Sequence, residues 1–425
     1  MYQQDTLPTI RPFADQTTAT AWCDRFDRKD ASPLGIRRVL TQVCHDLYGT
    51  KDVQNVITAT YVWLADQIGH LTLGLVPTLL LCWLFTLLLP QDTGFANALR
   101  IVLYVAAAAG VFAVWVAKER QDLKDTSARA GGVFPFDSGD IVWNVKTALL
   151  YFGIGGLLGL AAFISWKLCL LVLLLALWPA AAVAYWWLRR KLAFQQAGLP
   201  YLYRLANFTS PLEQDLKVTV EAIANLRNSR IDLSDVLIGR NKAPKPAEPA
   251  IRHLLITGFL NAGKTSLCAG MGTEFAFALG KTRYVSAQKL IELVLSEKSG
   301  GDARDYDDGR ILWGWRDCDL LLIDDVDAGV SVLDAAGAKS GHFIQAESFG
   351  KALSADRSTP ALQWLRARRS VWVLGDPSQA GSWRQTIARL MGVAETDVGL
   401  VRLELAEAGP EATTRSENPM GRFIK

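Results

Sequence analysis

The chain has 425 residues, half of them hydrophobic, and contains 14 Trp. Its mean hydropathy of +0.16 is too high for an ordinary soluble protein and indicates a membrane protein. The net charge of +3 gives no argument for nucleic-acid binding, and the scattered Cys and His residues match no zinc-site spacing.

Residues 1–70 form a segment before the long apolar runs. Its beginning lacks the basic and apolar regions of a secretory signal, so we expect it to stay in the cytosol. Within it, residues 33–47 and 53–68 place apolar residues at helical spacing. We predict two amphipathic helices that lie near the face of a membrane.

Four uncharged apolar runs follow, at residues 71–90, 101–117, 148–166 and 168–188. Each approaches the roughly 20 residues that a helix needs to cross a hydrocarbon core of about 30 Å. Only Lys167 separates the last two runs, and one helix covering both would be about 60 Å long. We therefore predict a tight hairpin there.

These runs predict a four-helix transmembrane domain over residues 71–190, with a cytosolic loop at 118–147. The runs contain no Asp, Glu, Lys or Arg, which argues against an ion or proton path through the bilayer. In the third run, Gly155 and Gly159 allow two helices to approach closely, either within one subunit or between subunits.

Basic residues around the runs predict the orientation of the chain. They are frequent before the first run, between 118 and 147, and directly after the last run, whereas the other two connections hold only Arg100 and Lys167. Because Lys and Arg favour the cytosolic side, both termini are expected in the cytosol. The predicted protein is a multi-pass membrane protein, with the bacterial inner membrane as its expected location and the lipid bilayer as a partner.

The remainder of the chain changes in character twice. Residues 191–250 read as a connector with a helix at 211–226 and a Pro/Ala/Lys-rich linker at 241–250. From residue 251 to 425, short apolar strands alternate with helices, as in a parallel α/β domain. The five strands are expected at residues 252–257, 282–285, 320–324, 371–374 and 400–405.

A phosphate-binding pattern follows the first of these strands. Gly258-Phe-Leu-Asn-Ala-Gly263-Lys264-Thr265 matches G-x-x-x-x-G-K-[ST] between a predicted strand and a predicted helix. Glycine permits the close backbone approach that lets N–H groups face phosphate oxygens, and the helix start adds its dipole. Lys264 is expected at the β and γ phosphates, and Thr265 at Mg²⁺. The expected nucleotide-binding residues are Gly258, Asn261, Ala262, Gly263, Lys264, Thr265 and Ser266.

A second pattern supplies carboxylates for the metal. An apolar strand ends in Asp324 and Asp325; we expect Asp324 to hold Mg²⁺ and Asp325 to orient or deprotonate the attacking water. Many P-loop ATPases have Glu where Asp325 stands, which leaves the turnover rate open. The 60-residue interval from Lys264 to Asp324 is too short for an ABC transporter ATPase, and no D-x-x-G or N-K-x-D indicates a GTPase. ATP is therefore the expected nucleotide.

Residues 258–325 resemble the AAA+ helicase-loader and transposition-helper ATPases of the DnaC and IstB type, including KTRYVSAQKLIELV and the LLIDD stretch. The resemblance extends to VWVLGDPSQAGSWRQTIARL. It implies that Asp376 senses the γ-phosphate, where the family usually has Asn, and that Arg389 reaches the nucleotide of a neighbouring subunit. Arg384 is the alternative finger. The resemblance does not cover the membrane half, so the family's DNA partners do not carry over.

Two functional hypotheses follow. The first is a homo-oligomeric, membrane-anchored ATPase that assembles or remodels a protein partner, of unknown identity, at the cytosolic membrane face. The second is a nucleotide-gated sensor or scaffold, or a defence-type effector, with slow or absent hydrolysis. A pore driven by the ATPase is the weaker third possibility because the spans show no polar pathway.

Overall fold

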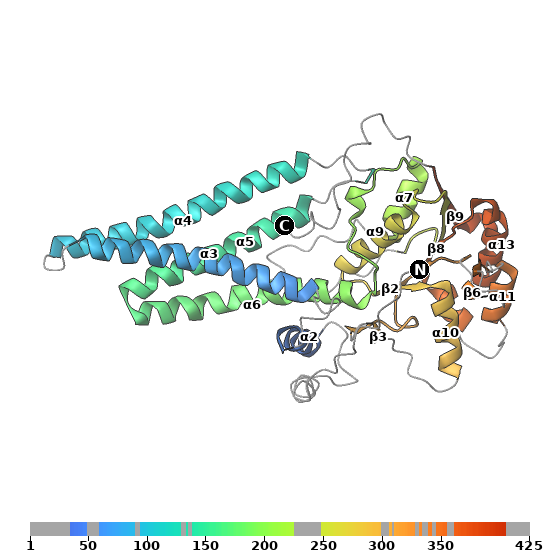
Figure 1. Cartoon of the computed structure of the whole chain (residues 1–425), viewed down its shortest axis with the longest axis horizontal. Helices are drawn as coiled ribbons and strands as arrows, with labels where there is room; N and C mark the ends of the chain where they lie inside the picture. Colours follow the sequence, from blue (N-terminus) through green and yellow to red (C-terminus); the bar gives the residue numbers. More distant parts are fainter. Residues whose placement is uncertain are drawn as a thin grey trace.

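A computed structural model of the protein describes residues 35–48, 59–89, 94–128, 133–134, 138–224, 248–298, 306–307, 310–327, 331–333, 339–341, 346–354 and 361–404. A bundle of long helices lies at one end of an elongated molecule, and an α/β domain lies at the other (Figure 1).

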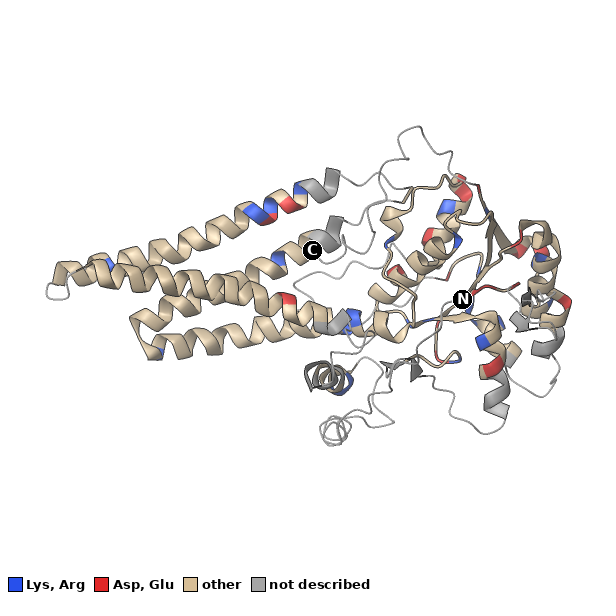
Figure 2. Ribbon diagram, in the orientation of Figure 1, with Lys and Arg blue, Asp and Glu red and all other residues tan. Residues whose placement is uncertain are grey.

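In the described part of the chain, four long helices form the bundle: α3 (Ala59–Leu88), α4 (Gly94–Ala128), α5 (Ser138–Ile164) and α6 (Trp166–Gln196). All four are long and apolar enough to cross a membrane, so the four predicted apolar helices are confirmed. Their charged residues lie mostly toward the α/β domain, as Figure 2 shows. This distribution suits a bilayer because charged side chains are costly in hydrocarbon.

The predicted hairpin between the last two spans is confirmed, and its turn lies at Ser165. The Ser165 backbone is extended (φ −167°, ψ 149°), and its side-chain oxygen accepts a hydrogen bond of 3.1 Å from the Leu168 N–H. Serine can cap a helix N-terminus in this way, whereas lysine cannot. Lys167 therefore lies inside the first turn of α6, with its ammonium 5.9 Å from the Trp166 ring centroid.

Close packing of α3 against α5 explains the glycines of the third span. A Cβ at Gly155 would overlap the carbonyl oxygen of Leu71, and a Cβ at Gly74 would overlap that of Phe152. At Gly159 a Cβ would lie 3.0 Å from the carbonyl oxygen of Leu75. The two helices thus meet backbone to backbone, so Gly155 and Gly159 serve packing within one subunit.

Replacing Gly155 by leucine is expected to lower the free energy of unfolding by about 3 kcal/mol, because the new side chain cannot fit without separating α3 from α5. Thermal unfolding of the detergent-solubilised protein, followed by circular dichroism, measures the effect. Gly110→Leu is the matched control, since a Cβ at Gly110 in α4 has no neighbour within 4 Å. Equal unfolding temperatures for the two variants would contradict the packing described here.

Two predicted segments outside the spans differ from the structure. Helix α2 (Ile36–Tyr48) forms as predicted, but residues 59–68 of the second amphipathic stretch are the first turns of α3; residues 53–58 lie outside the described residues. The expected loop at 118–147 is largely helical, because α4 runs to Ala128 and α5 begins at Ser138. The spacing of apolar residues does not show whether an amphipathic helix is separate from the membrane-spanning helix that follows it.

The α/β domain is built on a parallel sheet with strand order β2-β5-β8-β1-β9. Its five strands confirm the predicted ones within two residues. They are β1 (His253–Gly258), β2 (Thr282–Ser286), β5 (Leu320–Asp324), β8 (Arg369–Val373) and β9 (Val398–Leu403). The order places β8 between β1 and β5, so the carboxyl ends of these three strands are neighbours.

Helices cover both faces of this sheet. Along β5, Leu320 and Leu322 pack on the face covered by α9 (Lys264–Phe277), while Leu321 and Ile323 pack on the other face, as expected for strands buried on both sides. The other face is covered by α10 (Ala287–Lys298), α11 (Ala346–Ser354), α12 (Ala361–Ala367) and α13 (Ala380–Met391). Outside the main sheet, β3 (Tyr306–Asp307) pairs antiparallel with β4 (Arg310–Ile311), and β6 (Ser331–Leu333) pairs antiparallel with β7 (Lys339–Gly341).

The described part of the connector packs against the α/β domain. It contains the short helix η1 (Leu205–Asn207) and α7 (Gln214–Ile223), the latter at the predicted helix. Leu205, Phe208 and Val220 are buried in the same cluster as the β1 side chains Leu254 and Ile256. Residues 241–247 of the predicted linker lie outside the described residues, but residues 197–224 complete one face of the sheet.

The bundle and the α/β domain share a hydrophobic core where α6 meets α9. Trp186 and Leu192 of α6 are buried with Ala276 of α9 and with Trp313. Arg190 of α6 is only 1% exposed, and its Nε donates a hydrogen bond of 2.8 Å to the carbonyl oxygen of Phe277, the last residue of α9. The α/β domain therefore rests directly on the extension of a membrane-spanning helix.

Candidate functional site

The loop between β1 and α9 has the backbone conformation that its sequence predicts. Gly258 (φ 155°) and Gly263 (φ 86°) have positive φ, and a Cβ at Gly258 would overlap the carbonyl oxygen of Leu403 in β9. Asn261 also has positive φ, 63°, which asparagine tolerates better than most residues. Since α9 begins at Lys264, residues 261–266 surround a helix N-terminus, where backbone N–H groups attract anions.

Lys264 folds back over this loop. Its Nζ donates hydrogen bonds of 2.8 Å and 2.7 Å to the carbonyl oxygens of Gly258 and Phe259. Burial lowers the pKa of Lys264, while the carboxylates of Asp327, Asp324 and Asp325 act in the opposite direction. The lysine therefore interacts electrostatically with carboxylates at and just beyond the end of a different strand, β5.

Three further predicted loop residues lie around the same helix start. Ala262 is buried, and Thr265 and Ser266 are half-buried in the first turn of α9. The Ser266 hydroxyl is 3.0 Å from the hydroxyl of Tyr201, which comes from the connector. This contact fixes the connector beside the loop, a role for Tyr201 that the sequence does not predict.

Asp324 occupies the end of β5 and is only 2% exposed. Its Oδ2 accepts a hydrogen bond of 2.6 Å from the Tyr284 hydroxyl of β2, and its Oδ1 accepts one of 2.8 Å from the Asp325 N–H. Burial, together with this hydrogen bond, raises the pKa of Tyr284 well above its ordinary value. Tyr284 therefore remains a donor that orients the Asp324 carboxylate.

Asp325 differs from its neighbour in both conformation and exposure. It is exposed and has a positive φ of 52°, which costs energy for a residue with a side chain. Although the residue is exposed, partial desolvation of its carboxylate, and then the charges of Asp324 and Asp327, raise its pKa, whereas Lys264 lowers it. A carboxylate with a raised pKa accepts a proton more readily than an ordinary one.

Asp327 holds the end of the neighbouring strand. Its two carboxylate oxygens each accept a hydrogen bond of 2.7 Å, from the N–H groups of Gly375 and Asp376 just beyond β8. A Cβ at Gly375 would lie 3.0 Å from one of these oxygens, so glycine suits this close approach. The segment after β8 is thereby fixed beside the segment after β5.

The hydrogen bond to Asp327 positions the backbone of Asp376, whereas the Asp376 carboxylate caps a short helix, η3 (Pro377–Gln379). It accepts hydrogen bonds of 2.9 Å from the Ser378 N–H and 3.2 Å from Gln379 Nε2. Hydrogen bonds from Ser378 are the largest cause of its lowered pKa. Asp376 follows β8, the strand between β1 and β5, and its carboxylate is directed toward its own loop.

The two candidate arginine fingers lie on α13, across the sheet from α9. Arg384 is half-buried, and its Nε donates a hydrogen bond of 2.9 Å to the carbonyl oxygen of Val398 at the start of β9. Arg389 lies in the last turn of α13 and is exposed. The structure thus gives Arg384 a contact within the subunit and leaves Arg389 at the surface.

The contacts made by Tyr284 and Asp327 are not predicted from the sequence. Tyr284 belongs to the KTRYVSAQ stretch, and Asp327 is the third acidic residue of the IDDVD stretch. An acidic residue three positions after a metal-binding candidate is the signal that could have indicated the contact of Asp327 with the segment after β8.

No protein-family model matches this sequence, and comparison with curated proteins gives no match either. In the described residues, no group of three or more His, Cys, Asp and Glu is placed to hold a metal ion by itself. The candidate site is therefore formed by the residues at the ends of β1, β5 and β8.

Proposed function

We propose that the protein is a membrane-anchored ATPase that binds ATP and Mg²⁺ at residues 258–266. The observation that carries this proposal is that Lys264, at the start of a helix after a glycine loop, is close enough to Asp324 and Asp325 for their charges to raise its pKa. A loop of N–H groups with a lysine suits a polyphosphate, and the carboxylates suit its divalent cation.

In this proposal, each residue has one task. Lys264 leaves the carbonyl oxygens of Gly258 and Phe259 and binds the β and γ phosphates, while N–H groups of residues 261–266 hold the phosphate chain. Thr265 and Asp324 bind Mg²⁺, which proteins hold through few carboxylates together with substrate phosphates. The hydrogen bond from Tyr284 supports this role because it orients Asp324.

Asp325 is the proposed water-orienting group, and Asp376 the proposed sensor. The raised pKa of Asp325 supports its action as a base. The position of β8 between β1 and β5 supports a sensor after that strand, with the Asp376 carboxylate turning from η3 toward the γ-phosphate when ATP binds.

The direct test is Asp325→Asn in the purified full chain. ATP hydrolysis should fall by about 10² to 10⁴, because the variant loses the group that takes the proton, while ATP affinity changes little. Phosphate release and binding of a fluorescent ATP analogue measure the two quantities. Asp317→Asn, at an exposed turn before β5, is the matched control. Unchanged hydrolysis in Asp325→Asn would remove Asp325 from the mechanism.

ATP binding is further proposed to order a homo-oligomer on the cytosolic side of the membrane, where hydrolysis remodels a protein partner. The exposure of Arg389 supports contact with the ATP of a neighbouring subunit, whereas the hydrogen bond from Arg384 to Val398 supports a structural role. The basic residues near the α/β end of the bundle support the cytosolic orientation.

Arg389→Ala should then lower hydrolysis by about 10³ with ATP binding retained, as for loss of an arginine finger. Mixing Arg389→Ala chains with Lys264→Ala chains should restore part of the activity, because a mixed interface combines an intact loop with an intact finger. If Lys264→Ala chains regain hydrolysis when mixed with Arg384→Ala chains, but not when mixed with Arg389→Ala chains, Arg384 is the arginine finger. Hydrolysis insensitive to both substitutions would contradict the intersubunit site.

A nucleotide-gated sensor or scaffold is the second candidate function. The observation that favours it is the short, exposed side chain of Asp325 on a backbone with positive φ. In that case the chain would bind ATP tightly and hydrolyse it slowly. Steady-state turnover compared with ATP affinity in the same preparation separates the two, because rapid turnover excludes the scaffold.

A further inference from the structure

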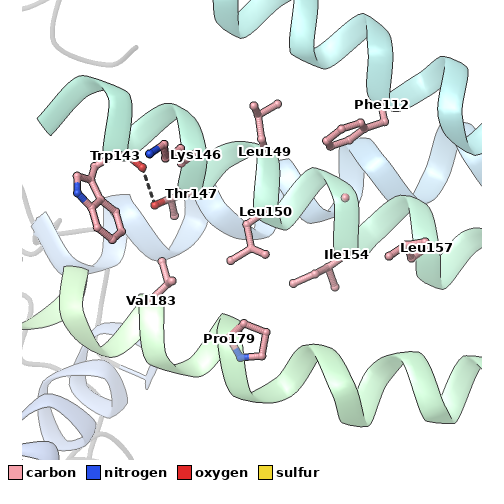
Figure 3. Close-up of a pocket in the computed structure, with 11 residues that line it drawn as sticks. Phe112, Trp143, Lys146, Thr147, Leu149, Leu150, Ile154, Leu157, Pro179 and Val183 are labelled. Carbon is pink, nitrogen blue, oxygen red and sulfur yellow. Dashed lines mark hydrogen bonds between the residues drawn. The ribbon is translucent and has the colours of Figure 1, made fainter. Parts of the chain in front are cut away.

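The helix bundle carries an apolar groove that the proposed ATPase site does not use. Its volume is about 440 Å³, and α4, α5 and α6 line it. In Figure 3, Leu150 and Ile154 of α5 point toward Pro179 and Val183 of α6, and Phe112 of α4 approaches from the other side. Gly153 leaves space in the groove because it has no side chain. A Cβ at this position would extend toward the Phe112 ring, 3.4 Å away, and would meet no other residue.

One end of the groove is polar and positively charged. Lys146, Trp143 and Thr147 line it there. The Thr147 hydroxyl is already used, since it donates to the Trp143 carbonyl oxygen and accepts from Trp187 Nε1. The exposed Lys146 makes no hydrogen bond or ion pair with other residues in the described part of the chain. It is therefore the charged group available to a ligand in the groove.

The groove has the depth of one bilayer leaflet. From Lys146 to Leu157, the lining residues of α5 extend over about 16 Å of helix, roughly half of a hydrocarbon core of about 30 Å. The charged end lies level with Trp143, Trp186 and Trp187, whose rings pack together. Because Trp186 and Trp187 are also buried with Ala276 of α9, this end of the groove lies where the bundle adjoins the α/β domain.

We propose that this groove binds an anionic phospholipid from the leaflet that faces the α/β domain. One acyl chain lies along Leu150, Ile154 and Leu157, and the phosphate contacts the Lys146 ammonium. The apolar wall matches an acyl chain because it offers no polar partner below Thr147. A single cation at headgroup level adds a preference for negative charge, as juxtamembrane Lys and Arg residues do.

The test measures which lipids remain on the full-length protein. The chain is reconstituted in vesicles of phosphatidylglycerol and phosphatidylcholine in equal amounts, extracted in mild detergent, and its retained lipids are quantified by mass spectrometry. We expect phosphatidylglycerol to be retained about fivefold over phosphatidylcholine, the effect of one lysine at the surface. Lys146→Ala should abolish this ratio while lipid is still retained, and Lys146→Arg should preserve it.

Two variants fill the groove instead of changing its charge. Gly153→Leu and Leu150→Phe should each reduce the retention of both lipids, whereas Gly110→Leu, in open space on α4, should not. Lys167→Ala, at the opposite end of the bundle, controls for general charge effects. Equal retention of the two lipids by the wild type, or a ratio unchanged in Lys146→Ala, would overturn the proposal. Retention unchanged in both groove-filling variants would overturn it as well, since the lipid would then lie elsewhere on the bundle.

Discussion

Replacing Lys264 by alanine is expected to lower ATP affinity by about a hundredfold and to reduce hydrolysis below detection. Charged hydrogen bonds contribute about 1.5 to 3 kcal/mol each, and loss of about 2.7 kcal/mol corresponds to a factor of a hundred. Of the two carbonyl oxygens that now accept from Lys264, that of the exposed Phe259 can bind water instead, whereas Gly258 is buried.

The substitution also has an effect that a merely structural lysine would not produce. Partial desolvation and the charges of Asp324 and Asp327 raise the pKa of Asp325, while Lys264 lowers it. Removing the ammonium should therefore raise the pKa of Asp325 further, which carbon-detected NMR of the carboxyl groups can follow. Lys289→Ala, on the surface of α10, is the control and should change neither quantity. Hydrolysis that survives in Lys264→Ala would contradict the whole site.

The strands and the glycine loop could be predicted from sequence because local patterns determine them. Buried parallel strands such as β5 are continuous apolar runs that end in polar residues, and Gly258 and Gly263 stand where side chains would clash or strain the backbone. Four membrane spans are equally local, since length and the absence of charge are sufficient. The turn between the last two spans was predicted at Lys167 and lies two residues earlier, at Ser165, because the start of α6 depends on a single capping hydroxyl.

Contacts between distant segments could not be predicted in this way. The hydrogen bonds from Tyr284 to Asp324 and from the Gly375 N–H to Asp327 depend on which strands are neighbours, and the strand order follows from no local pattern. The connector gave no signal that Leu205 and Phe208 would complete the sheet's core. In the sequence, Arg190 is one of the basic residues after the last apolar run, and no local pattern shows that it is buried between the two halves of the molecule.

Replacing Arg190 by alanine should uncouple these two halves. The guanidinium carbon lies 4.8 Å, 5.1 Å and 5.2 Å from the ring centroids of Trp186, Trp187 and Phe277, and Nε caps the α9 C-terminus at the Phe277 carbonyl oxygen. The variant loses cation–π contacts and leaves a buried acceptor with one donor fewer. We expect a loss of about 3 kcal/mol at the joint between α6 and α9.

The consequence is a change in cooperativity rather than a uniform loss of stability. Helix α9 begins at Lys264 and ends at Phe277, so its 14 residues connect the phosphate loop to α6 over about 20 Å. In the wild type, an ATP analogue should raise a single unfolding temperature, because a ligand that binds only the folded state stabilises everything that unfolds with its site. In Arg190→Ala, unfolding should separate into two transitions, with the analogue raising only that of the α/β domain.

Differential scanning calorimetry in detergent distinguishes these outcomes. Arg189→Ala is the neighbouring control, since the Arg189 guanidinium lies over the Tyr185 ring of its own helix, and it should keep one transition. A single transition in Arg190→Ala that still rises with the analogue would show that the remaining contacts of the joint suffice. Two transitions would instead identify the buried arginine as the contact through which nucleotide at the loop stabilises a membrane helix.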